Sequence, residues 1–439
     1  MAASFRRPAS LVCFALLPLS LEAAPPRFAV RLMEPPDRLE YSAPFGLNDR
    51  GEIAGYAAPE PFHPLAAAIR ISASGDATVL PAEGDPPSYN FAYEITNGGR
   101  VVGISDRRAC YWVGGERKYL QVPESVFSGA AAAANEAGII CGSYGDSDEI
   151  GPRHCVWTAL DQPPLTLKGL FGENTVGTVW GINEKGEMAG SSGGVEGGFV
   201  AAYWPSPGAD PFPIGPLPGA FNSEARAINE SGDIVGRSSF ESFETQAFLW
   251  KMEEEELVPL PFLEEGPGYA EAFDVNDRRQ VVGTMRVSGR VHAVLWQDGT
   301  AHDLNTLVVS ADPRIRYLSS AGAINNAGQI ATEAVVSENE ELDLPRWIAL
   351  LSPLFIRGDA NGDGAVDIAD PVATLGFLFL GDAAPGCLEA ANANDEGDID
   401  ISDAVHTLNY LFLGGEPIPP PFPEEGADPT PGAPGCSST

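Results

Sequence analysis

The residues best suited to chemistry in this sequence are oxygen donors near its carboxyl end. They occur at alternating positions from residue 359, and Gly364 stands where a tight loop must turn sharply. Calcium is a hard cation that takes roughly six to eight oxygen ligands, and a loop of about twelve residues with a central glycine can aim them at one point. The spacing therefore predicts a calcium site formed by Asp359, Asn361, Asp363, the backbone carbonyl of Ala365, Asp367 and Asp370.

The same pattern occurs again from residue 392, so this part of the chain is an internal duplication. The second predicted set of calcium ligands is Asn392, Asn394, Glu396, Asp398, Asp400 and Asp403. Asn392 stands where the first copy has Asp359, and Glu396 stands where it has Asp363. We expect the second site to bind Ca²⁺ more weakly, because affinity depends on the charge and fit of the ligands.

Each loop leads into an expected helix. Pro371 suits the first turn of a helix, and Val372 and Phe379 lie on one face at helical spacing. Val405 and Phe412 hold the same places in the second copy. The sequence therefore predicts a small α-helical, calcium-binding domain over residues 354–415, followed by a proline-rich tail over residues 416–439.

The larger part of the chain is built from one short motif, Asn-x-x-Gly-x-Ile/Val-x-Gly. Its seven copies, some of them imperfect, start at Gly46, Glu94, Ala133, Gly181, Ala227, Asp274 and Ala323. An asparagine side chain accepts from backbone N–H groups two residues on, and a following glycine tolerates positive φ, so each copy predicts a tight hairpin. The copies lie roughly 45 residues apart, which is room for four strands and is typical of a β-propeller blade.

We therefore predict a mainly β fold, a seven-bladed β-propeller over residues 25–353, with six or eight blades as the alternatives. The last repeat has no fourth strand before residue 353, whereas residues 27–35 have the pattern of a strand that precedes the first motif. We expect this N-terminal strand to close the last blade, because a closed ring leaves no exposed sheet edge.

Aromatic residues recur at fixed places in the repeat. Five strands end in Trp112, Trp157, Trp204, Trp250 and Trp296, and His154 and His292 share a second column. A residue that recurs in blade after blade is more often needed for packing than for catalysis. We expect both columns to pack in the core, and a carbohydrate-binding platform of tryptophans is the alternative.

The turn motif, followed by strands such as QAFLW at 246–250 and VHAVLW at 291–296, resembles the HAF family of extracellular repeats over about residues 43–353. The resemblance implies an exported β-rich protein and no established catalytic residues.

The duplicated loop-helix units resemble a bacterial type I dockerin over about residues 355–436. The features that carry this resemblance are LFLG after each helix, a cysteine between the units and a proline-rich tail with DPT. It implies calcium binding through the loops and docking to a cohesin-like or cell-surface protein.

The N-terminus has the order of a secretory signal. Arg6 and Arg7 precede an apolar run over residues 11–21, which is followed by Ala23 and Ala24. We expect residues 1–24 to be a signal peptide, the mature protein to be extracellular or at the cell surface, and no membrane span to remain after cleavage.

An exported protein can form disulfides. Cys387 and Cys436 bracket the second calcium unit and the tail, and we expect them to be bonded to each other. A second bridge between Cys141 and Cys155 is the alternative use of the remaining cysteines, with Cys110 left over.

The charge and the motifs limit the function. A net charge of −35 excludes nucleic acid as a partner, because binding it requires clustered Lys and Arg. The sequence contains no Gly-x-Ser-x-Gly, His-Glu-x-x-His or Gly-x-x-x-x-Gly-Lys motif, so we assign no catalytic or cofactor-binding residue apart from the calcium ligands.

We expect a secreted, non-enzymatic propeller that binds a glycan or a protein. The alternative is a glycoside hydrolase or polysaccharide lyase of a polysaccharide-degrading assembly, with polysaccharide bound at the propeller mouth. Its acid and base would come from acidic loops such as residues 253–256, 146–149 or 338–341. A third hypothesis is a structural surface-layer component.

Overall fold

The computed structural model describes residues 25–36, 39–60, 63, 65–83, 89–124, 126, 128–145, 151–172, 175–193, 198–264, 268–309, 311–336, 345–430 and 436. The predicted signal peptide and the acidic runs at 146–149 and 338–341 lie outside the described residues. Among the helices of the described ranges, none has the length and apolar character needed to cross a membrane.

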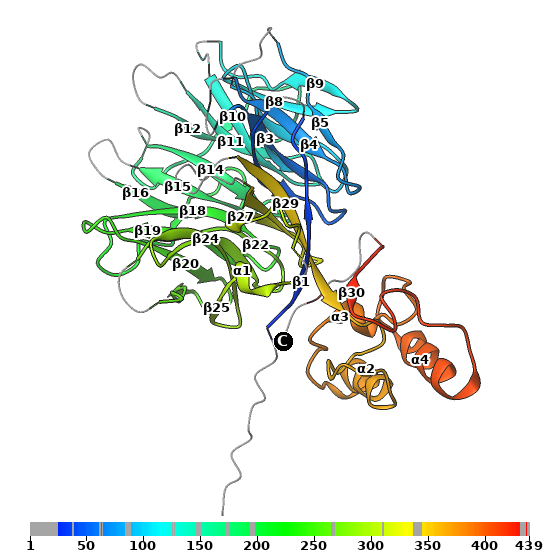
Figure 1. The fold of residues 1–439 in the computed structure, drawn as a ribbon. Coiled ribbons are helices and arrows are strands. Elements are labelled where there is room, and N and C mark those ends of the chain that lie inside the picture. The colour runs from blue at the N-terminus through cyan, green and yellow to red at the C-terminus, as the bar shows by residue number, and fades with distance from the viewer. Residues whose placement is uncertain are drawn as a thin grey trace, which may run out of the picture.

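The fold is mainly β and propeller-like, with sheets that follow one another from blue to yellow in Figure 1. Five sheets have four antiparallel strands each, in chain order. The first two comprise β6 (Phe91–Ile95), β7 (Val101–Ser105), β8 (Arg108–Val113) and β9 (Glu116–Tyr119), then β10 (Ser128–Ala134), β11 (Ile140–Gly145), β12 (Arg153–Trp157) and β13 (Leu165–Thr166). The third comprises β14 (Val176–Ile182), β15 (Met188–Gly193), β16 (Phe199–Trp204) and β17 (Phe212–Pro213). The last two comprise β18 (Asn222–Ile228), β19 (Ile234–Ser239), β20 (Thr245–Lys251) and β21 (Glu256–Pro259), then β22 (Ala270–Val275), β23 (Val281–Val287), β24 (Arg290–Gln297) and β25 (Thr300–Asp303).

A ten-stranded sheet joins the two ends of the repeat region. Its first-repeat strands are β2 (Tyr41–Leu47), β3 (Ile53–Ala58), β4 (Ala67–Ile71) and β5 (Ala77–Val79). Its other strands are β1 (Phe28–Leu32), β26 (Val308–Val309), β27 (Tyr317–Ile324), β28 (Ile330–Val335), β29 (Arg346–Phe355) and β30 (Gly426–Ala427), and the short helix α1 (Leu304–Leu307) precedes β26. β1 pairs antiparallel with β29, so the predicted pairing of the N-terminal strand with the last repeat is confirmed.

The repeated asparagine builds each turn as its chemistry predicts. In the first repeat the Asn48 side chain accepts from the backbone N–H of Arg50 at 3.1 Å and of Glu52 at 2.9 Å. Gly51 has φ +74°, which a residue with a side chain rarely adopts. The two residue types therefore favour the turn, although Thr96 replaces the asparagine in the second copy and Arg279, with φ +59°, replaces the glycine in the sixth.

The same asparagine also links neighbouring repeats, because its Nδ2 donates to the backbone carbonyl of the turn residue in the next copy. These bonds run from Asn48 to Thr96, Asn135 to Asn183, Asn183 to Asn229, Asn229 to Asn276, Asn276 to Asn325 and Asn325 to Asn48, at 3.0–3.1 Å. The last bond returns to the first repeat. The turns therefore form a ring of hydrogen bonds, which is interrupted after Thr96 because threonine has no amide to donate.

The C-terminal module lies to one side of the sheets, in orange and red in Figure 1. It contains α2 (Ala369–Leu380), α3 (Leu388–Ala391) and α4 (Ile401–Leu413), and β30 returns to pair with β29. The predicted disulfide between Cys387 and Cys436 is confirmed.

The alternative bridge between Cys141 and Cys155 is wrong, because both thiols are free and buried. Cys141 pairs with Val156 across β11 and β12, whereas Cys155 pairs with Gly142. Side chains alternate between the two faces of a sheet, so the two sulfur atoms point in opposite directions.

Most of the recurrent aromatic residues pack in the core, as expected. Trp112, Trp157, Trp204 and Trp296 are buried, and each Nε1 donates to a backbone carbonyl of the preceding repeat at 2.7–2.8 Å. His154 is buried with Nε2 2.8 Å from the Ser191 carbonyl oxygen, and burial lowers its pKa to about 4. Trp250 and His292 are only half-buried, and His292 Nδ1 lies 2.8 Å from Asp303 Oδ2. The expectation of core packing is therefore confirmed for these four tryptophans and for His154.

Candidate functional site

One column of the repeat differs in chemistry between copies. It lies two residues before each turn asparagine or threonine, directly after a β-bulge in the first strand of the repeat. Five copies have a small residue there, namely Gly46, Ala133, Gly181, Ala227 and Ala323. The other two copies have Glu94 and Asp274. At Gly46 and Gly181 a side chain would meet the backbone of the next repeat at 2.8–3.2 Å, so the small residues let neighbouring repeats approach closely.

Glu94 and Asp274 lean toward the same part of the ring. A Cβ on Gly46 would lie 2.7 Å from Glu94 Oε1, so Glu94 reaches over the first repeat. Asp274 Oδ2 accepts from the backbone N–H of Ile324 at 2.9 Å, so Asp274 reaches toward the last repeat. Because the first and last repeats are neighbours, the two carboxylates approach each other.

Their environment favours the protonated forms. Burial, with a contribution from the negative charge of Asp274, raises the pKa of Glu94 to about 8. Burial raises the pKa of Asp274 to about 7, although its carboxylate accepts from the backbone N–H groups of Ile324 and Val275. At neutral pH the pair can therefore present one carboxylic acid and one carboxylate.

Both carboxylates line a small polar opening of about 190 Å³. Residues that follow the turn asparagines form its rim, and each accepts a hydrogen bond from a backbone N–H of the neighbouring repeat. The acidic members of the rim are Asp49, Glu136, Glu184, Glu230 and Asp277. The way to Glu94 and Asp274 is therefore lined with negative charge.

The first calcium loop holds its predicted ligands in place with backbone hydrogen bonds. The Asp359 carboxylate accepts from the N–H of Asp363 at 3.1 Å. The Asp370 carboxylate accepts from Asn361 at 3.2 Å and from Asp367 at 2.7 Å. Burial and the charges of Asp359 and Asp363 raise the pKa of Asp370 to about 6, so these carboxylates are close together. The donor set is all oxygen, which fits a hard divalent cation.

The second loop repeats this arrangement. The buried Asn392 accepts from the N–H of Glu396 at 3.2 Å. The buried Asp403 accepts from Asn394 at 3.2 Å and from Asp400 at 2.9 Å. Of the remaining predicted ligands in the two loops, Ala365 and Asp398 are exposed. Each loop has the oxygen donors that a cation needs.

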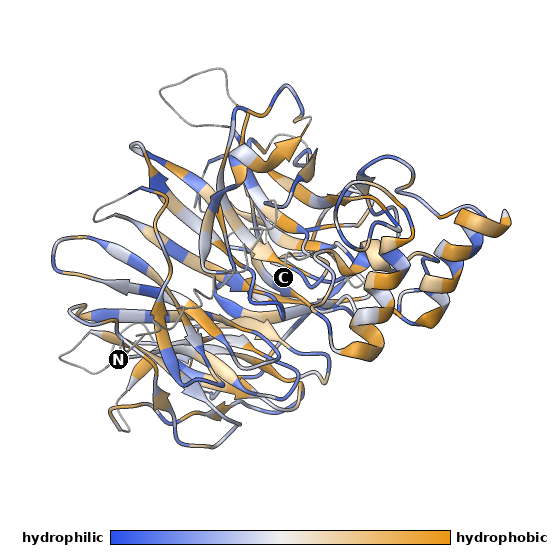
Figure 2. Cartoon of the chain, turned by 90° about the horizontal axis from the view of Figure 1, so that it is seen from below, coloured by the Kyte–Doolittle hydropathy of each residue, from blue (hydrophilic) through white to orange (hydrophobic). Residues whose placement is uncertain are grey.

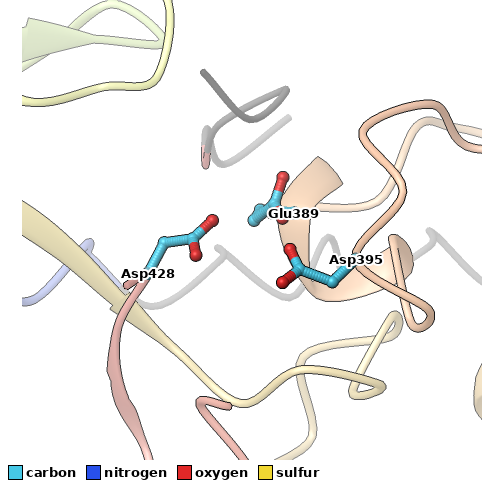
Figure 3. A group of neighbouring side chains, drawn as sticks. All are labelled: Glu389, Asp395 and Asp428. Carbon is cyan, nitrogen blue, oxygen red and sulfur yellow. The ribbon is translucent and has the colours of Figure 1, made fainter. Parts of the chain in front are cut away.

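A separate acidic group lies outside the two sets of predicted ligands (Figure 3). Glu389, Asp395 and Asp428 each offer a carboxylate oxygen, and these atoms lie within 4.8 Å of one another. This spacing could hold a metal ion. Arg357 contacts all three carboxylates.

The sequence patterns did not mark these three residues as a site, and Glu94 and Asp274 stood there only as the first residues of two motif copies. The alternative acid and base were expected on acidic loops, but in the described part of the chain residues 253–256 form an exposed turn between β20 and β21. Glu94 and Asp274 could have been found by aligning the seven motifs, because they are the charged residues in a column of Gly and Ala.

No family model matches the chain, and no curated protein matches it. Several solved structures are similar at low identity. A puromycin hydrolase mutant complexed with PGG is 12% identical over 68% of this chain and 50% of that chain, with a TM-score of 0.46. Oligogalacturonate lyase in complex with manganese is 12% identical over 73% of this chain and 92% of that chain, with a TM-score of 0.48. Acylaminoacyl peptidase of Pyrococcus horikoshii is 12% identical over 69% of this chain and 50% of that chain, with a TM-score of 0.40. The chain spans about half the length of the first and the third of these proteins.

The expectation of a non-enzymatic binding propeller is corrected at this point. For this chain itself, the case for chemistry rests on Glu94 and Asp274, because two carboxylates with raised pKa values in one opening are costly for a ring that only binds or supports.

Proposed function

We propose that this chain is a seven-bladed β-propeller enzyme that hydrolyses glycosidic bonds, with Glu94 and Asp274 as its acid and base. The observation that carries the proposal is that two carboxylates with raised pKa values share the central opening, at positions where the other repeats have Gly or Ala. Seven copies of the turn and the hydrogen bond from Asn325 back to Asn48 support the count of seven blades.

Glycoside hydrolysis requires one carboxylic acid to protonate the leaving oxygen and one carboxylate to activate water or attack the sugar. Glu94 has the higher pKa, about 8, so it keeps its proton at neutral pH and serves as the acid. Asp274 has a pKa of about 7, so it is the first of the two to ionise and serves as the base or nucleophile. The hydrogen bonds from Val275 and Ile324 hold the Asp274 carboxylate in position.

The opening limits the substrate. Ligand pockets usually measure roughly 300–1,000 Å³, and this opening measures about 190 Å³, so it suits the end of a glycan chain. The acidic rim repels polyanionic glycans. A lyase would use the same two carboxylates but act beside the carboxylate of a uronic acid, which this rim disfavours. A neutral or cationic glycan therefore fits best.

The test is the release of reducing sugar from a panel of neutral, cationic and uronic-acid oligosaccharides. We expect Glu94→Gln and Asp274→Asn to lower the rate by about 10²–10⁴-fold, as removal of a general acid or base does. Glu253→Gln, in the exposed turn, is the matched control and should leave the rate unchanged. A wild-type protein that cleaves none of the panel, or an active Glu94→Gln/Asp274→Asn double variant, would show that the proposal is wrong.

We also propose that the C-terminal module attaches this enzyme to a cohesin-like or cell-surface protein outside the cell, with Ca²⁺ bound in both loops. The supporting observation is a duplicated apolar surface on α2 and α4, which appears orange in Figure 2. Its exposed members are Ile368, Val372, Phe379 and Leu380 on the first unit and Ile401, Val405, Phe412 and Leu413 on the second. Exposed apolar surface of this kind is typical of protein interaction sites.

Binding of purified cohesin domains, measured by calorimetry with Ca²⁺ and with a chelator, tests this attachment. We expect the Val372→Glu/Val405→Glu double variant to lose binding. Phe243→Glu, at a fully exposed apolar residue of the repeat region, should not affect it. Binding by the double variant equal to wild type would contradict the assignment of this surface.

A further inference from the structure

Arg357 lies at the centre of a buried charge cluster where the C-terminal tail meets the second loop-helix unit. Its side chain is fully buried. Nη1 donates to Glu389 at 2.6 Å, and Nη2 donates to Asp395 at 3.0 Å and to Asp428 at 3.1 Å. Three carboxylates against one guanidinium leave two negative charges when all three are ionised. One divalent cation would therefore neutralise the cluster.

Two oxygens of this cluster lack a donor among the described residues. Glu389 Oε2 and Asp428 Oδ2 are buried, and neither accepts from a donor within the described part of the chain. The two carboxyl groups lie within hydrogen-bonding reach of each other, so either a shared proton or a cation can satisfy them. The Glu389 side chain is only 1% exposed, and its other oxygen, Oε1, is the one that faces Arg357. A buried carboxylate oxygen without a partner costs roughly 1–3 kcal/mol or more, so something must satisfy this pair.

The geometry suits a metal ion. One oxygen from each carboxylate lies within 4.8 Å of the other two, which is about twice the ~2.4 Å distance from Ca²⁺ to a ligand oxygen. The three side chains come from α3, from the turn that follows it and from the segment after β30, and they point toward one another (Figure 3). The Arg357 guanidinium, which the figure does not draw, contacts all three. An adjoining cavity of about 320 Å³, lined by Glu389, Asp428 and Thr430, can supply water as further ligands.

The cluster also lies where the two copies of the duplication differ. Glu389 takes the place of Ile356, and Asp395 takes the place of Gly362. Gly362 has φ +72°, which suits a glycine, and Asp395 keeps the same backbone shape with φ +62°. A side chain in this conformation is uncommon, and here it brings the third carboxylate to the cluster.

We propose that Glu389, Asp395 and Asp428 bind a divalent cation separate from the two loop ions, and that this ion ties the C-terminal tail to the second unit. The carboxylate donors and the surrounding water favour Ca²⁺ over softer metals. Arg357 holds one oxygen of each carboxylate, and the Thr430 hydroxyl lies 2.9 Å from the other oxygen of Asp395. The oxygens left for the ion are therefore Glu389 Oε2 and Asp428 Oδ2, with Asp395 as the third donor. The site uses none of the predicted loop ligands, although Asp395 lies in the second loop between Asn394 and Glu396.

The first test counts bound ions. The full chain is stripped with a chelator, desalted and titrated with Ca²⁺ alone in a calorimeter. Asp428→Asn should bind one ion fewer than wild type, whereas Glu425→Gln, in the same segment, should bind as many as wild type. Asp359→Asn/Asp363→Asn should lose a loop ion and keep the one held by Asp428. An unchanged ion count in Asp428→Asn would overturn the proposal. A proton shared between Glu389 and Asp428 would then be what satisfies their two buried oxygens.

The second test needs no variant and so does not depend on the folding of Asp428→Asn. Wild-type crystals grown with CaCl₂ are measured at a long wavelength, where calcium scatters anomalously. A peak between the three carboxylates supports the site. No peak there, with peaks present in the loops, would contradict it.

Discussion

The repeat region and the C-terminal module are both built by copying, but they place their reactive groups in different ways. In the repeat region the residues shared by all or most copies, such as the turn asparagines and the buried tryptophans, bond to the next repeat and hold the ring together. The reactive groups are the exceptions, Glu94 and Asp274. In the module the shared residues are the predicted calcium ligands, and the exceptions form the cluster around Arg357.

The difference follows from how many copies must fit together. Seven repeats close a ring only if each one satisfies its neighbours, so the shared polar residues are used for assembly. The two loop-helix units can have ligand residues at the same positions, because each loop can bind an ion by itself. A residue type that recurs in the copies therefore stabilises the assembly in the repeat region, whereas in the C-terminal module it is a predicted metal ligand.

Removal of Ca²⁺ should separate the two regions most strongly. We expect a chelator to unfold residues 354–436, because the loop carboxylates would repel each other without an ion, while the repeat region keeps its β-sheet circular dichroism. Heteronuclear NMR or hydrogen exchange would report the two regions separately. Equal protection of the module with and without chelator would contradict the assignment of the loops.

Removal of the disulfide should lower the free energy of unfolding more than removal of a free thiol. We expect Cys387→Ala/Cys436→Ala to lower the free energy of unfolding of the module by about 2–4 kcal/mol, because it frees a loop of the unfolded chain. Cys110→Ala removes a buried but free thiol of the repeat region, so we expect a smaller loss there. Thermal melts with Ca²⁺ present measure both, and a larger loss for Cys110→Ala would reverse the comparison.

Glu94, one of the two charged residues in a column of Gly and Ala, should lower the free energy of unfolding as the pH rises. Its pKa is about 8 in the fold and near 4.5 as a free side chain, so the folded state holds its proton more tightly than the unfolded state. Stability from this group is therefore complete below pH 4.5 and is lost as the pH rises toward 8. We expect the free energy of unfolding of Glu94→Gln, relative to that of wild type, to increase by roughly 2–3 kcal/mol as the pH rises from 5 to 9. Denaturant unfolding at several pH values measures this difference. A constant difference across this range would refute the buried-carboxylate description.

The turn asparagines should show smaller, opposite effects. Asn183→Ala removes a buried side chain that donates to the Asn229 carbonyl and accepts from the Glu187 N–H, so we expect a loss of about 1–3 kcal/mol. Thr96→Asn restores the missing donor of the second repeat and should gain roughly 0.5–1.5 kcal/mol. Denaturant titration measures both, and a loss of stability in Thr96→Asn would contradict the ring of hydrogen bonds.

Local chemistry explains which features the sequence predicts. Five of the seven turns have both an asparagine and a glycine three residues later, so the repeat could be recognised without a structure. The pairing of residues 27–35 with the last repeat and the bond from Cys387 to Cys436 could be recognised as well. The approach of Glu94 to Asp274 depends on closure between the first and last repeats, which no local pattern encodes. Asp428 likewise meets Glu389 only because β30 returns to β29.

The dependence of kcat/KM on pH tests the proposed acid–base pair most directly. With a neutral oligosaccharide that the enzyme cleaves, we expect the rate to rise as Asp274 ionises near pH 7 and to fall as Glu94 loses its proton near pH 8. With an aryl glycoside, whose leaving group needs no acid, Glu94→Gln should keep measurable activity and lose only the fall at high pH. A profile in which Glu94→Gln keeps the high-pH fall would mean that another group is the acid, and the account of this opening would be wrong.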